Sequence, residues 1–237
     1  DGTALRPLWN TLLVNQFHDI LPGSCIAAAN DRSLHDMAEM LHTGSELLRS
    51  WFAPAQNCYT VLNPLDEPCR DVFYLPQIAS GFIAQEPGVT LQNVLLADGT
   101  AATAVYGLER PALGAAVLHF VPGEQPAQTS RFVYDGKTLT TPLLQVQLDE
   151  LGRITSLVTR ADGMQWADGP MNTLLMAEDV SAGWDGWDID ADCMMKLQPA
   201  ARLTKQTVTA DGPQEFRLHS RYELGTATIL EQDMIFR

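Results

Sequence analysis

The stretch LQVQLDELGRITSLV, residues 144–158, decides the fold class predicted for this chain. Leu144, Val146 and Leu148 alternate with two glutamines, which is the period of a strand with one buried face. A Leu-Gly dipeptide then turns the chain into a second apolar run. The stretch therefore predicts two antiparallel strands joined by a tight turn.

The same pattern recurs through the chain after residue 57. Short apolar runs are bounded by turn residues, and Asp98-Gly99 stands where a two-residue hairpin loop would. The other expected strands are 58–62, 72–75, 94–96, 102–106, 116–121, 131–134, 204–209, 215–222 and 226–236. No amphipathic run of helical length interrupts them, which favours antiparallel sandwiches over a parallel α/β sheet.

The chain before residue 53 has a helical period instead. Apolar residues recur at three- and four-residue spacing over residues 5–16 and, more loosely, over residues 26–51. Ser24 follows a Pro-Gly pair and is the predicted N-cap of the second helix. These residues predict a helical hairpin with a tight turn at 18–24.

Composition and charge exclude several classes of protein. Of the 237 residues, 46% are hydrophobic and 19% are charged, which excludes an intrinsically disordered chain. A net charge of −14 argues against nucleic acids and anionic membrane surfaces as partners. Four cysteines without a C-x-x-C pair argue against a disulfide scaffold or a cysteine zinc site, and they are consistent with a cytoplasmic protein. The first residue is Asp1 and not Met, so we expect a processed product or an excised piece.

One cluster of polar residues lies in the predicted turn of the hairpin. Asn15-Gln16-Phe17-His18-Asp19 is flanked by apolar residues on both sides. An imidazole is the commonest nitrogen ligand of zinc, and a neighbouring carboxylate can orient it or accept a hydroxyl. The alternative is a core histidine with satisfied hydrogen bonds and an aspartate that caps a turn. Spacing alone does not decide between these two interpretations, because one His-Asp pair cannot complete a zinc site of three or four ligands.

A second cluster lies between residues 177 and 192 and combines carboxylates with Trp184 and Trp187. Aromatic rings stack on the apolar faces of sugars while carboxylates accept sugar hydroxyls, so a carbohydrate surface is one interpretation. Three aspartates are spaced D-x-D-x-D as in a calcium loop, but the positions where an EF-hand needs Gly and Glu hold other residues. The third interpretation is a loop whose tryptophans anchor it on a neighbouring domain.

Both clusters resemble segments of one family, glycoside hydrolase family 38, the class II α-mannosidases. The resemblance covers residues 12–26, 62–64, 146–157 and 178–190, in the same order as in the family. Phe17-His18 before the aspartate is similar to the cytosolic or vacuolar members and their bacterial relatives.

The resemblance implies roles for individual residues. His18 matches the family's histidine ligand of a catalytic zinc ion, for which cobalt substitutes in some members. Asp19 matches the residue that binds hydroxyls of the mannose at the metal, and Trp184 and Trp187 are further candidates for substrate binding. The family's reaction is retaining, with a carboxylate nucleophile and a second carboxylate as acid/base.

The implied catalytic carboxylates and the other three metal ligands belong to an N-terminal α/β barrel, whose His-x-Asp motif is absent from this sequence. We therefore expect no catalytic residue in this chain, and no activity from the chain by itself. The implied partners are the missing N-terminal barrel of the same polypeptide and an α-mannoside, with terminal α-mannose of oligosaccharides or glycans as the substrate.

The implied fold is α+β and mainly β. Residues 1–53 would be a segment of the middle three-helix bundle, residues 54–127 a small β-sandwich, and residues 128–237 the start of a truncated large C-terminal β-sandwich. Two alternative functions stay open: a carbohydrate-binding module without chemistry, and a purely structural β-sandwich with a helical arm.

Overall fold

The computed structural model describes residues 2–52, 55–184 and 186–237. Asp1, Ala53, Pro54 and Asp185 lie outside the described residues, and with them the first two positions of the predicted change from helical to strand period near 53–57. The chain forms two compact units. The helical unit comprises residues 1–55 and 177–196, and the β unit comprises residues 56–176 and 197–237. The predicted division into domains at 53/54 and 127/128 stays a prediction.

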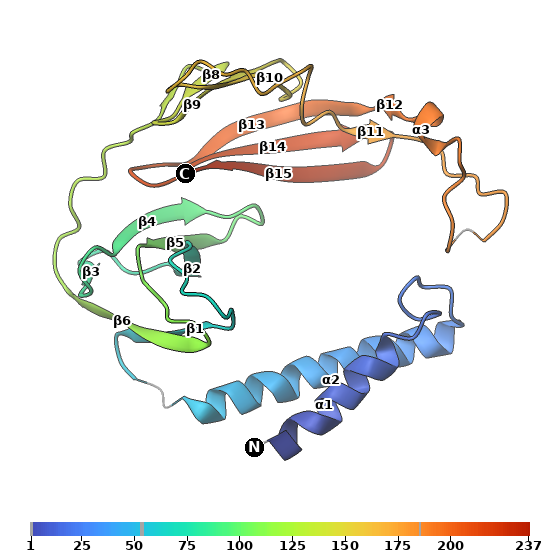
Figure 1. Ribbon diagram of the computed structural model, residues 1–237, viewed down its shortest axis with the longest axis horizontal. Helices are drawn as coiled ribbons and strands as arrows, with labels where there is room; N and C mark the ends of the chain where they lie inside the picture. Colours follow the sequence, from blue (N-terminus) through green and yellow to red (C-terminus); the bar gives the residue numbers. More distant parts are fainter. Residues whose placement is uncertain (1, 53–54, 185) are drawn as a thin grey trace. The chain divides into compact units, whose positions relative to one another are not determined.

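The helical unit is built on the predicted hairpin (Figure 1). Its helices are α1 (Gly2–Asn15) and α2 (Ala27–Trp51), and a short α3 (Cys193–Lys196) ends the segment that returns to this unit. The prediction of Ser24 as the N-cap of α2 is wrong. The N-cap is Ile26, whose side chain makes no capping hydrogen bond, because the helix begins two residues further along than the sequence suggested. The Ser24 hydroxyl instead bonds to a tryptophan, as described below.

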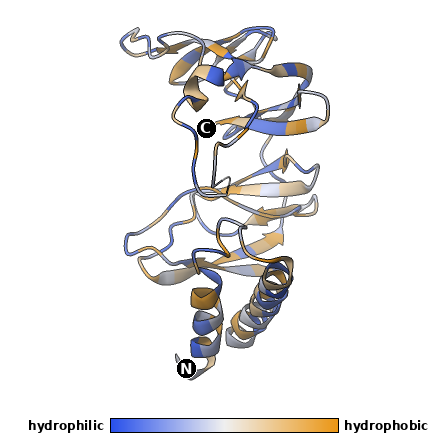
Figure 2. Ribbon diagram, turned by 90° about the vertical axis from the view of Figure 1, so that its right-hand side faces the viewer, coloured by the Kyte–Doolittle hydropathy of each residue, from blue (hydrophilic) through white to orange (hydrophobic). Residues whose placement is uncertain are grey.

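The two helices bury little apolar surface by themselves. Among their described residues only Asn15 is buried, whereas Trp9, Leu34 and Leu41 are 58%, 64% and 67% exposed. Figure 2 shows hydrophobic bands between hydrophilic ones along both helices. Amphipathic helices are stabilised mainly when another part of the protein covers their apolar face. Within the described residues, the apolar faces of these two helices are largely uncovered, so the hairpin gains little stability from burial. No helix in the described part of the chain has the length and apolar character needed to cross a membrane.

The first half of the β unit is a small sandwich of two antiparallel three-stranded sheets. One sheet has the order β1-β6-β3 and the other the order β2-β5-β4. Their strands are β1 (Cys58–Asn63), β2 (Phe73–Pro76), β3 (Phe82–Ala84), β4 (Thr90–Leu95), β5 (Ala101–Tyr106) and β6 (Gly114–Pro122). Leu91, Val105, Leu118 and Phe120 form a buried core that the two sheets share.

The second half of the β unit contains the stretch 144–158. Its strands are β7 (Val133–Tyr134), β8 (Thr138–Thr140), β9 (Leu144–Leu148), β10 (Ile154–Thr159), β11 (Leu175–Met176), β12 (Gln198–Pro199), β13 (Ala201–Asp211), β14 (Phe216–Leu224) and β15 (Thr228–Phe236). They form sheets of order β10-β9-β8-β7, β11-β12 and β13-β14-β15. Val146 and Leu148 are buried while the two glutamines of β9 are exposed, so the predicted alternation is confirmed. With Phe216 and Leu218 they form the core of this half.

The α+β, mainly β class is confirmed by these sheets. Four strands were not predicted, namely β3, β8, β11 and β12. Each has only two or three residues, which is too short for a hydrophobic period to be visible in the sequence.

The turn between β9 and β10 depends on Asp149 and Gly152. The Asp149 carboxylate accepts hydrogen bonds from the backbone nitrogens of Leu151 and Arg153, both at 2.9 Å, and from Arg153 Nε at 2.7 Å. Burial acts to raise the pKa of Asp149, but these bonds outweigh it and lower that pKa. Gly152 has a φ of +73°, and a Cβ there would lie 2.5 Å from the Tyr222 hydroxyl. Both the backbone conformation and the lack of space therefore require glycine.

A buried glutamine joins the small sandwich to the sheet β13-β14-β15, whose strand β13 comes close to β4. Gln92, on β4, donates from Nε2 to the Glu215 carbonyl oxygen at 2.7 Å. Its Oε1 accepts from the backbone nitrogens of Gln214 and Glu215 at 3.1 and 3.0 Å. Gly212 lies in the same turn, and a Cβ there would stand 2.5 Å from the Gln92 side chain. The two halves are therefore in direct contact here.

The Glu215 carboxylate completes this junction. It is fully buried, and it accepts hydrogen bonds from both halves. Oε1 accepts from Arg217 Nε and Nη2 at 3.0 and 2.9 Å. Oε2 accepts from the hydroxyls of Tyr74 and Tyr106, both at 2.9 Å, and from Arg237 Nε at 3.2 Å. Burial, followed by the Glu215 charge, raises the pKa of Tyr106, which keeps its hydroxyl protonated as a donor.

Glu215→Gln should lower the free energy of unfolding by about 3 kcal/mol or more, because the neutral amide removes the buried charge that Arg217 and Arg237 share. Urea denaturation of the whole chain measures the change. Glu223→Gln is the matched control, since it removes a carboxylate that pairs with Arg202 at the surface. Glu223→Gln should leave the urea midpoint of unfolding nearly unchanged. Equal shifts in the two variants would contradict the role assigned to Glu215.

Candidate functional site

The polar turn of the hairpin lies between α1 and α2. The backbone nitrogens at positions 16, 17, 20 and 21 donate to carbonyl oxygens three or four residues earlier, at distances of 2.9–3.2 Å. Gly23 follows with a φ of +76°, a conformation that residues with a Cβ rarely adopt. These successive tight turns place His18 and Asp19 at the tip of the hairpin.

His18 contacts one aromatic ring from its own turn and one from the returning segment. Its ring centroid is 4.2 Å from that of Phe17 and 5.7 Å from that of Trp187, which meets it edge-on. Its Nε2 is 3.9 Å from Asp19 Oδ2, which is too long for a hydrogen bond. The side chains of His18 and Asp19 are 65% and 50% exposed, so the alternative of a core histidine does not hold.

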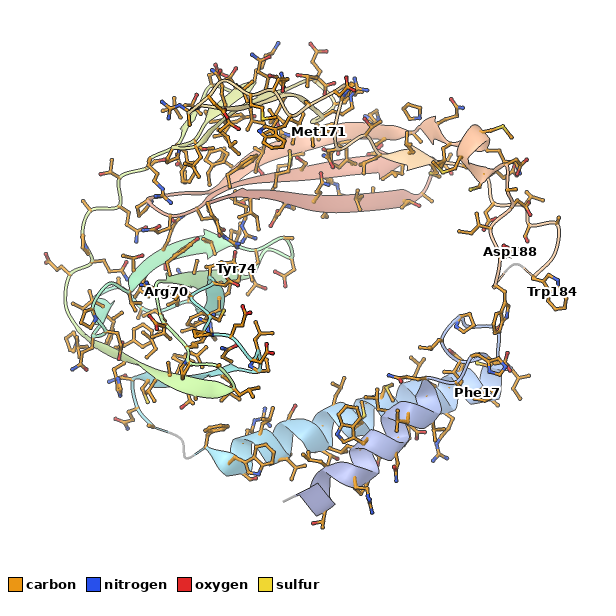
Figure 3. All side chains as sticks on the ribbon, viewed as in Figure 1. Phe17, Arg70, Tyr74, Met171, Trp184 and Asp188 are labelled. Carbon is orange, nitrogen blue, oxygen red and sulfur yellow. The ribbon has the colours of Figure 1, made fainter. Side chains whose placement is uncertain are left out.

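The segment 177–196 presents its two tryptophans differently. Both lie in one turn, in which the backbone nitrogen of Trp187 donates to the backbone carbonyl oxygen of Trp184 at 2.7 Å. Trp184 has a φ of +60°. Trp184 is 80% exposed, and its side chain extends away from the chain (Figure 3). Trp187 is 52% exposed, and its Nε1 donates to the Ser24 hydroxyl at 2.9 Å.

The aspartates of this segment are engaged within it. Lys196 Nζ lies 3.0 Å from Asp192 and 4.0 Å from Asp190. Asp188 accepts a hydrogen bond from the backbone nitrogen of Ile189 at 2.9 Å. The D-x-D-x-D spacing therefore serves the local structure of the segment, including its attachment to α3.

The structure brings together three of the four residues that the sequence singled out. Trp187 reaches the turn of His18 and Asp19 through its contacts with His18 and with Ser24, which is 163 positions away in the sequence. Trp184 shares the segment but projects from it. Sequence reasoning missed the role of Ser24. A partly buried indole N–H usually has a hydrogen-bond partner, but nothing local identifies a partner so distant in the chain.

The polar turn contains two side chains of types that bind metal ions. The described residues contain no group of three or more His, Cys, Asp or Glu side chains that could hold a metal ion. A zinc site takes three or four protein ligands, so His18 and Asp19 together are too few. An imidazole nitrogen and a carboxylate are nevertheless donor types that zinc binds, and both side chains are accessible. The residues present therefore fit one corner of a zinc site whose other ligands would come from elsewhere.

Removing the hydrogen bond between Trp187 and Ser24 should loosen the returning segment. In Trp187→Phe and in Ser24→Ala the 2.9 Å bond is lost, so amide hydrogen exchange over residues 181–190 should accelerate by about three- to tenfold in each variant. The double variant should exchange no faster than either single variant, because all three remove the same bond.

Trp166→Phe is the matched control for this test. It removes the hydrogen bond from the Trp166 Nε1 to Thr159, 2.6 Å long, within the β unit, and should leave exchange over 181–190 unchanged. Additive effects of Trp187→Phe and Ser24→Ala would contradict a direct bond.

Comparison with known proteins finds a matching family model at each end of the chain. The family model described as the alpha mannosidase middle domain matches residues 1–53. The model described as the glycosyl hydrolases family 38 C-terminal domain matches residues 139–236. His18 lies in the first match and Trp187 in the second.

The curated relatives that match this chain are much longer than it. Alpha-mannosidase 2C1 of Mus musculus is 28% identical over 196 residues, and that of Homo sapiens is 29% identical over 202 residues. Each alignment covers 79% of this chain and 17% of the relative. The chain thus spans under a fifth of the curated relatives that it matches.

Two solved structures share the fold. An alpha-mannosidase from Enterococcus faecalis V583 has a TM-score of 0.60 at 12% identity, with 93% of this chain and 31% of that chain covered. A glycosyl hydrolase family 38 protein from Enterococcus faecalis has a TM-score of 0.57 at 10% identity, with 92% and 32% covered. Taken with the two family models and the curated relatives, they lead to one conclusion: the chain is similar to proteins of glycoside hydrolase family 38 over both of its matched segments, residues 1–53 and 139–236.

Proposed function

We propose that this chain is part of a zinc-dependent, retaining α-mannosidase that hydrolyses terminal α-mannose residues of oligosaccharides or glycans. The chain would supply one metal ligand and substrate contacts. The catalytic carboxylates and the other ligands would come from an N-terminal barrel of the same polypeptide. The observation that carries the proposal is the contact between the His18-Asp19 turn and Trp187 in a chain similar to proteins of this family. A cytoplasmic location and the domain division at 53/54 and 127/128 belong to the same proposal.

His18 is proposed as the metal ligand because of its donor chemistry and its access. A neutral imidazole is the commonest nitrogen donor to zinc, and the His18 side chain is 65% exposed. The rings of Phe17 and Trp187 contact the imidazole and restrict its orientation, which favours a preorganised donor. Zinc, when bound, would supply a positive charge that polarises and orients sugar hydroxyls.

Asp19 is proposed as an acceptor for sugar hydroxyls. An ionised carboxylate can only accept hydrogen bonds, and the Asp19 side chain is half exposed. Its Oδ2 lies 3.9 Å from His18 Nε2, so a hydroxyl near the imidazole is also near this carboxylate. Trp187 beside His18 offers an apolar ring edge against which a sugar could rest, and Trp184 offers a second ring on the same turn.

The metal assignment is tested in the full-length polypeptide that contains this sequence. His18→Ala should reduce bound zinc from about one equivalent to a small fraction of it, because one of the protein ligands is removed. Elemental analysis after exhaustive dialysis measures the content. His35→Ala is the control, since His35 is an exposed histidine on α2 that faces Glu39. Zinc content that stays the same in His18→Ala would sink the ligand assignment, whatever the activity.

A carbohydrate-binding module without chemistry is the second candidate function. The observation that favours it is the exposure of Trp184, an aromatic ring 80% open to solvent in a turn that Trp187 anchors to the hairpin. Exposed aromatic rings provide stacking surfaces for sugars.

Calorimetric titration of this chain with mannose separates the two candidates. In a binding module, Trp184→Ala and Trp187→Ala should each weaken mannose binding by about three- to tenfold, because each removes a stacking ring. Trp166→Ala is the control, because Trp166 is 58% exposed but lies in the β unit. In the α-mannosidase the sugar site needs residues outside this chain, so the chain alone should show no saturable mannose binding at millimolar concentration.

A further inference from the structure

A polar pocket lies at the junction of the two halves of the β unit, whereas the residues of the proposed function belong to the helical unit. Its volume is about 510 Å³, and its lining includes Arg70, Asp71, Tyr106, Arg131, Gln214 and Arg237. Three arginines and one aspartate therefore line the same pocket. This is the reverse of the balance in the chain as a whole, whose net charge is −14.

Two of these arginines are not committed to an ion pair. Arg70 donates to the Gly107 carbonyl oxygen at 3.4 Å, and Arg131 donates to Gln214 Oε1 at 3.5 Å. Both distances are at the long limit of a hydrogen bond. Neither arginine forms an ion pair within the described part of the chain, although acidic residues outnumber basic ones by 29 to 15. Arg131 also lies over the Phe132 ring at 5.8 Å, which helps to orient it.

The third arginine is held in place by the junction. Arg237 Nε donates to Glu215 at 3.2 Å, and its Nη2 donates to the Tyr74 hydroxyl at 2.8 Å. Its side chain remains 45% exposed, so part of the guanidinium stays open to the pocket. Figure 3 labels Arg70 and Tyr74 on the small sandwich. The positive groups thus come from three separate parts of the chain: the loop before β2, the linker before β7 and the residue after β15.

We propose that this pocket binds an oxyanion, a phosphate or carboxylate group carried by a small molecule. A guanidinium presents N–H donors in a fork that matches the spacing of two oxygens on such a group, and charge-assisted bonds of this kind are about twice as strong as neutral ones. Arg70 and Arg131 supply the free donors, and Arg237 adds a fixed positive charge. The pocket consists of residues of the β unit alone, so the proposal stands whether or not His18 binds a metal.

The test is calorimetric titration of the whole chain with inorganic phosphate and, separately, with citrate at low ionic strength. The chain should bind one of the two anions saturably. Arg70→Gln and Arg131→Gln should each weaken that binding by at least about tenfold. Arg6→Gln, at an exposed position of α1, removes the same charge from the helical unit and should leave the affinity within about twofold.

The two anions distinguish the source of the oxyanion. Tighter binding of phosphate identifies a phosphate group, and tighter binding of citrate identifies carboxylates.

Because Arg70 and Arg131 are exposed and make only long hydrogen bonds, their variants should keep the unfolding midpoint of the parent chain, which urea denaturation checks. Arg70→Lys and Arg131→Lys, which keep the charge but lose the fork, should fall between the parent and the glutamine variants. Lack of saturable binding of either anion, or an equal loss in Arg6→Gln, would overturn the proposal.

Discussion

The buried carboxylate of Glu215 is the interaction on which the β unit depends. An isolated charge with no solvent exposure is strongly unfavourable, and it becomes tolerable only when charged partners and hydrogen bonds surround it. Tyr74 and Tyr106 reach Glu215 from the small sandwich, whereas Arg217 and Arg237 reach it from the other half. The hydrogen bonds of this one carboxylate therefore link the two halves of the β unit to each other.

This junction also shapes the arginine pocket. Tyr106 lines the pocket while its hydroxyl donates to Glu215, and Arg237 is held by the same carboxylate. The positions of Arg70 and Arg131, which lie on the connections before β2 and β7, depend on where the two halves meet. A bound oxyanion would therefore add counter-charge at the place where the β unit has already concentrated positive groups around a buried acid.

The helical unit depends on a different kind of contact. Its two helices leave large apolar side chains exposed. Among the contacts of its described residues, a hydrogen bond from Trp187 to Ser24 and a ring contact between Trp187 and His18 hold the returning segment to the hairpin. Those contacts join the two clusters that the sequence had marked separately, one in each family match. The geometry at the turn is that of an accessible donor beside an accessible carboxylate, packed by aromatic rings, which is the basis of the proposed sugar and metal contacts.

The sequence by itself determined the local structure, namely the strands within 144–158 and the helical hairpin. It also singled out His18 and Trp187 as candidate site residues, which stay a prediction. Hydrophobic period and turn chemistry act over a few residues, so they can be read directly from the chain. The tertiary structure alone decided that Ser24 bonds to Trp187 instead of capping α2, that Glu215 is buried, and that arginines from three segments share a pocket. Each of these depends on polar groups far apart in the sequence that compensate one another in space, and no local pattern encodes such a pairing.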